Sequence, residues 1–69
     1  MPAFSQAVFS SHVEEVGWDE GGMIVQFKTG KRVIYQDVSE DLARSIANAG
    51  SVGDALNTQI KGRYTFRYI

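Results

Sequence analysis

The chain has 69 residues and no cysteine, so it must fold around a small core that no disulfide bond reinforces. It also has a single histidine, which excludes a closed zinc site built from cysteine and histidine ligands. A chain of this length has room for one hydrophobic core. Turns, helix caps or contacts with another chain must therefore supply much of the stability.

Alternating apolar and polar residues predict three antiparallel strands that follow one another along the chain. The alternation covers residues 12–18, 23–28 and 32–36. The first two segments are separated by Asp19-Glu20-Gly21-Gly22 and the last two by Thr29-Gly30, and both separators suit tight chain reversals. The pattern therefore predicts a three-stranded antiparallel meander.

Two helices are expected after the meander, over residues 39–49 and 52–58. Ser39 is a favourable N-cap, and the two acidic residues that follow it place negative charge where the helix dipole favours it. Apolar residues then recur every three or four positions, which gives the first helix one apolar face. Ser51 can cap the shorter second helix.

The predicted fold class is α+β, with the meander followed by two helices and a C-terminal extended segment. Residues 1–11 show no clear period and are expected to form an irregular N-terminal arm, so that residues 12–69 make up the domain. The positions expected to be buried are Val16, Trp18, Val25, Phe27, Val33, Leu42, Ile46 and Leu56.

Catalysis is not expected from this residue inventory. Ser11 and His12 are neighbours, so on an extended chain they point to opposite faces and cannot form a nucleophile and base pair. The acidic pairs Glu14-Glu15 and Asp19-Glu20 would need burial to act as general acid and base, and so small a domain has little interior. We expect no enzyme, no catalytic residue, no small-molecule substrate, and no cofactor or metal.

The charge balance and the short apolar runs bear on where the protein acts. A net charge of −1 gives the whole molecule no attraction to nucleic acid or to an acidic membrane. The longest unbroken apolar runs have three residues, which argues against a membrane span and a signal peptide. We expect a soluble, cytoplasmic protein that does not contact a membrane.

The C-terminal stretch from Ile60 to Ile69 combines aromatic and basic residues and contains no acid. If this stretch is extended, its aromatic side chains share one face and its cations share the other. Aromatic side chains beside cations suit contact with a single-stranded nucleic acid or with an acidic surface of a partner protein. The same aromatic side chains can instead fill the core, and Tyr35 allows the same two interpretations.

The candidate partner-binding residues are therefore Tyr35, Lys61, Arg63, Tyr64 and Arg67. We expect the three cations to be exposed on one face. Tyr64 and Phe66 are expected to be at least partly buried.

Four motifs follow one another in a recognisable order: Val16-Gly17-Trp18-Asp19, Ile24 to Gly30, Val33 to Val38, and Asn57 to Phe66. Together they resemble the KTSC family, a short domain at the C-terminus of some lysyl-tRNA synthetases and also a free-standing small protein of bacteria and phages. The resemblance runs from Ser10 to Arg67. Where the family has a central Tyr-x-Tyr, this chain has Val33-Ile34-Tyr35.

The resemblance implies no catalysis and an association with information processing. We expect a small non-enzymatic module that regulates transcription or translation by binding a protein component, for example RNA polymerase. The acidic charge balance favours this protein partner. The alternative is a module that binds RNA or another single-stranded nucleic acid through its C-terminal basic and aromatic segment.

Overall fold

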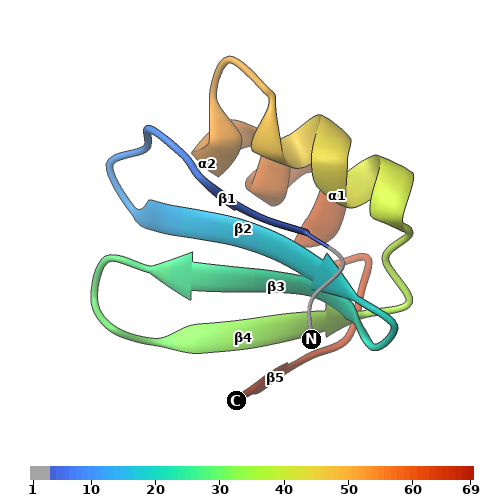
Figure 1. The fold of residues 1–69 in the computed structure, drawn as a ribbon. Helices are drawn as coiled ribbons and strands as arrows, with labels where there is room; N and C mark the ends of the chain where they lie inside the picture. Colours follow the sequence, from blue (N-terminus) through green and yellow to red (C-terminus); the bar gives the residue numbers. More distant parts are fainter. Residues whose placement is uncertain (1–3) are drawn as a thin grey trace.

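The computed structural model describes residues 4–69, which form a five-stranded antiparallel sheet with a helical layer on one face (Figure 1). The strands lie side by side in the order in which they occur along the chain. They are β1 (Phe4–Ala7), β2 (Val13–Asp19), β3 (Gly22–Phe27), β4 (Arg32–Gln36) and β5 (Phe66–Tyr68). The predicted α+β class is confirmed.

Strands β2, β3 and β4 form the predicted meander. The turn between β2 and β3 depends on Gly22, whose φ of +136° is rarely adopted by other residues. A Cβ atom at this position would also clash with the main chain of Tyr35 on β4. Gly30, with a φ of +95°, serves the turn between β3 and β4, as its place between the two apolar runs predicts.

The predicted three-stranded sheet is too small, because both ends of the chain add a strand. The N-terminal arm was expected to be irregular, but Phe4–Ala7 pairs with β2 in a register that places Phe4 opposite Trp18. Residues 1–3 of that arm lie outside the described residues. At the other edge, β5 pairs with β4 and places Phe66 opposite Tyr35. Both added strands are too short for alternation to reveal them.

The helical layer consists of α1 (Glu40–Ala47), α2 (Val52–Ala55) and the π-helical turn η1 (Leu56–Ile60). Both predicted caps are confirmed, because Ser39 Oγ accepts a hydrogen bond from the Leu42 amide and Ser51 Oγ accepts one from the Asp54 amide. The second helix does not continue regularly to residue 58, because the chain widens into η1 after Ala55.

The core lies between the helical layer and one face of the sheet. Five of the residues expected there are almost fully buried, namely Val16, Val25, Val33, Ile46 and Leu56. Three others, Trp18, Phe27 and Leu42, pack against this core and are partly buried. The Trp18 indole Nε1–H donates a hydrogen bond of 2.6 Å to the Val38 carbonyl, which joins β2 to the segment leading into α1.

Replacement of Ile46 tests the contact between helix and sheet. Its side chain is fully buried, so Ile46→Ala should lower the free energy of unfolding by about 2–4 kcal/mol in denaturant titrations. Ser45→Ala on the exposed side of α1 is the control, and it should change that free energy by about 0.5 kcal/mol or less. Equal unfolding midpoints for the two variants would mean that α1 does not cover the sheet in solution.

Candidate functional site

The face of the sheet that carries the core continues beyond the helical layer. Helix α1 packs on β2 and β3, and Figure 1 shows the helices above this part of the sheet, with β5 at the far edge. A groove of 760 Å³ lies at this uncovered edge. We call it the edge groove; residues of β5, of the turn at 61–65, and of the hairpin formed by β3 and β4 line it.

Aromatic side chains form the floor and one wall of the edge groove. Tyr35 lies at its base and is only 4% exposed. The ring centroid of Phe66 lies 5.7 Å from that of Tyr35 and 5.8 Å from that of Tyr68. Phe66 and Tyr68 are 50% and 64% exposed, so the edge groove presents a large apolar surface to solvent.

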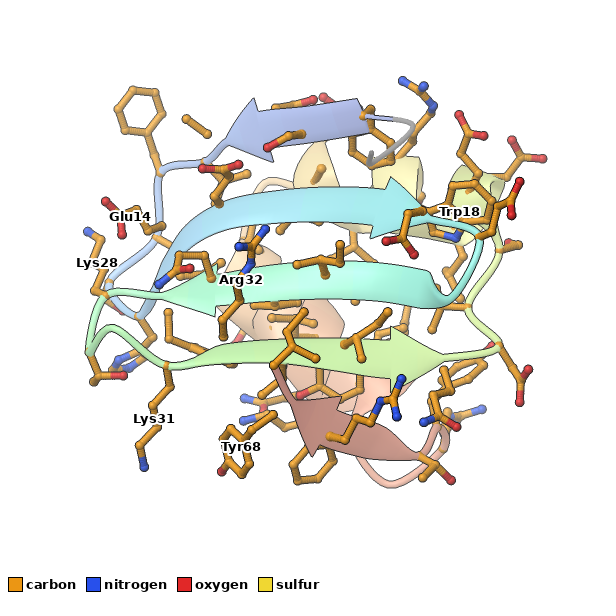
Figure 2. All side chains as sticks on the ribbon, turned by 60° about the horizontal axis from the view of Figure 1, so that its bottom comes forward. Glu14, Trp18, Lys28, Lys31, Arg32 and Tyr68 are labelled. Carbon is orange, nitrogen blue, oxygen red and sulfur yellow. The ribbon has the colours of Figure 1, made fainter. Side chains whose placement is uncertain are left out.

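The other lining residues make the edge groove electropositive. The Lys31 ammonium lies 5.9 Å from the ring centroid of Tyr68, at the limit of a cation–π contact. Figure 2 shows these two side chains close together at the β5 edge of the sheet. Lys61 and Arg63 are exposed and line the edge groove from the turn before β5. None of the described residues that line it is acidic.

The candidate residues from the sequence separate into two groups. Tyr35, Lys61, Arg63 and Tyr64 all line the edge groove, with Tyr64 partly buried. Arg67 does not line it, because the alternation along β5 puts its side chain on the opposite face of the sheet from Phe66 and Tyr68. All three expected cations are exposed, but the expectation that they share one face is wrong.

The expected burial of Phe66 is also wrong. The expectation depended on an extended conformation from Ile60 to Ile69. In the structure, η1 and the following turn occupy residues 56–63. Phe66 thus emerges beyond the helical layer and stays exposed. Tyr68 lines the edge groove but was not among the residues predicted from the sequence, and Lys31 joins the groove from the turn between β3 and β4. The pairing of Val33 with Tyr68 across β4 and β5 brings this part of the chain together, and no local pattern indicates it.

Tyr35 has an altered acidity. Burial of its hydroxyl raises the pKa of Tyr35 above the ordinary value of 10.0, and charge repulsion from Tyr68 raises it further. At neutral pH the phenol is therefore protonated. It offers a hydrogen-bond donor at the base of the edge groove.

Comparison with known proteins places this fold in a family. The family model of the KTSC domain matches residues 9–64, which is most of the chain. The chain belongs to the KTSC domain family. A crystal structure of a KTSC domain protein from Yersinia pestis matches this KTSC domain with a TM-score of 0.84 and 28% sequence identity, over 96% of each chain. No curated protein matches.

The family match covers most of the edge groove but leaves out the outer strands. The KTSC match ends at Tyr64, so it includes Lys31, Lys61 and Arg63 but not β5.

No group of three potential metal ligands occurs among residues 4–69. Within the same residues, no helix is long and apolar enough to cross a membrane.

The pKa of Tyr35 predicts how the stability of this KTSC domain changes in alkali. Well below pH 10 the phenol is protonated in both the folded and the unfolded chain, so pH does not alter its contribution. Above pH 10 the unfolded chain loses the proton first, because the folded-state pKa is raised, and stability falls. In urea titrations from pH 8 to 11.5, the wild-type chain should lose more stability than Tyr35→Phe. Parallel pH profiles for the two proteins would contradict a raised pKa.

Proposed function

We propose that this KTSC domain is a non-enzymatic binding module whose edge groove engages a protein component of the transcription or translation machinery, for example RNA polymerase, in the cytoplasm. The supporting observation is an exposed aromatic cluster that is bordered by cations and by no described carboxylate. The link to transcription or translation comes from the family resemblance, since relatives of this domain occur within lysyl-tRNA synthetases.

The composition of the edge groove suits a protein interface. Tyrosine and arginine are enriched among the residues that contribute most to binding between proteins, and such residues cluster in pockets that exclude water on binding. Phe66 and Tyr68 expose apolar area that a partner would remove from water. Lys31, Lys61 and Arg63 would favour a partner with acidic side chains around an apolar centre.

The ring orientations favour a protein over a strand of stacked bases. Successive bases of a single strand stack with their planes parallel, so a stacking platform needs ring faces that lie open in similar orientations. Here the planes of Phe66 and Tyr68 are at 87°, and those of Tyr35 and Phe66 are at 47°. Rings tilted in this way suit a pocket for branched or aromatic side chains better than a platform for bases.

Single-stranded nucleic acid is the second candidate, because three cations and no described acid line the edge groove. If these cations contact three phosphates, the logarithm of affinity should fall with the logarithm of salt concentration with a slope of about −2. Anisotropy of a labelled oligouridylate in increasing salt measures this slope. A protein partner that buries apolar surface should instead stay bound at moderate salt.

Affinity capture with a matched pair of variants tests the proposed function. Lys61→Glu/Arg63→Glu changes two residues of the edge groove, and Lys28→Glu/Arg32→Glu makes the same change in charge at exposed residues that do not line it. Capture from a bacterial lysate, with and without nuclease, should retain the same protein partner on the wild-type and control chains. The groove variant should lose at least nine-tenths of it.

The outcomes separate the two candidate functions. Capture that disappears after nuclease treatment would favour nucleic acid over protein. Equal capture by the groove variant and the control variant would contradict the proposed site, provided that circular dichroism and thermal unfolding show both variants folded. Because all four substituted side chains are exposed, each variant should unfold within a few degrees of the wild-type chain.

A further inference from the structure

Strand β5 leaves one of its two edges open. It is the last strand of the sheet and all three of its residues are exposed. The Ile69 amide donates a hydrogen bond to the Arg32 carbonyl, and the Gln36 amide donates one to the Thr65 carbonyl. In an antiparallel pair such hydrogen-bonded positions alternate with positions whose main-chain groups point outward. The amides and carbonyls of Phe66 and Tyr68 therefore point away from β4.

The open edge of β5 is charged in a way that disfavours pairing with a second copy of itself. If two copies of β5 paired antiparallel with all three residues overlapping, Arg67 would lie directly opposite the same residue of the other copy. Like charges at directly opposed positions destabilise a sheet. A single cation on a short edge strand is one of the ways in which proteins prevent such self-association. The same cation would attract an acidic strand.

The two faces beside the open edge differ in chemistry. On one face, Phe66 and Tyr68 continue the wall of the edge groove, with Lys31 beside Tyr68. On the other face, the side chain of Arg67 is exposed. Among residues 4–69 the only ion pair joins Arg44 to Glu40, so Arg67 has no acidic partner within these residues. An added strand would therefore meet apolar rings at alternate positions on one face and a cation between them on the other.

We propose that an acidic, extended segment of a partner protein adds to β5 as a sixth antiparallel strand. This inference rests on the proposed function and specifies how the partner engages the edge groove. The main chain of the segment bonds to the outward amides and carbonyls of Phe66 and Tyr68. Its apolar side chains face these two rings, and an acidic side chain between them lies opposite Arg67.

A synthetic peptide of seven alternating glutamate and valine residues, labelled with fluorescein, tests this geometry by anisotropy. In an antiparallel sixth strand with valines opposite Phe66 and Tyr68, the valine amides donate to β5 and the glutamate amides point away. N-methylation of the valine amides should therefore weaken binding at least tenfold. N-methylation of the glutamate amides should weaken it less than threefold.

The variants provide the second measurement. Arg67→Glu should weaken the unmodified peptide at least tenfold, whereas Lys28→Glu, which makes the same charge change at an exposed residue outside β5 and outside the edge groove, should alter it less than twofold. Any of three results would overturn strand addition. The two methylated peptides could bind equally well, binding could be lost only when the glutamate amides are methylated, or the unmodified peptide could fail to bind. The lysate capture reports separately on the proposed function, because it depends on the edge groove and not on this peptide.

Discussion

The helical layer of this fold is narrower than the sheet that it covers, and the remaining features follow from this mismatch. The eight residues of α1 and the short segments α2 and η1 bury the apolar faces of the central strands. They end before β5, because the chain must turn at residues 61–65 to reach the sheet edge. The rings of Phe66 and Tyr68 therefore lie on the core side of the sheet but outside the core.

The stability of so small a domain depends on local features that fix the turns, the helix starts and the position of the helical layer on the sheet. Glycines with positive φ shape the turns, serines cap both α-helices, and Trp18 donates to the Val38 carbonyl at the point where the chain leaves β4 for α1. The register from β2 to β4 then places Val16, Val25 and Val33 in one row beneath the helical layer. The same row continues on β5 with Tyr68, which extends past that layer.

The sequence was informative where a residue acts through its neighbours in the chain. Alternation predicted the meander, and Ser39 and Ser51 predicted the helix starts, because these signals are local. The outer strands could not be predicted in the same way, since β1 and β5 contain four and three residues and are defined by pairing with distant segments. Part of the edge groove could be predicted, because Lys61, Arg63 and Tyr64 are close together in the sequence. Lys31 lies far from them in the sequence and reaches the groove only through the fold.

The central claim is that the uncovered edge of the sheet is the surface that a partner protein contacts. Amide chemical shifts of ¹⁵N-labelled protein, recorded during titration with the glutamate and valine peptide, test it most directly. The account predicts that the changes concentrate at residues 31–35 and 61–69 and that the amides of α1 stay unchanged. Changes centred on α1, or on the β1 edge of the sheet, would contradict it.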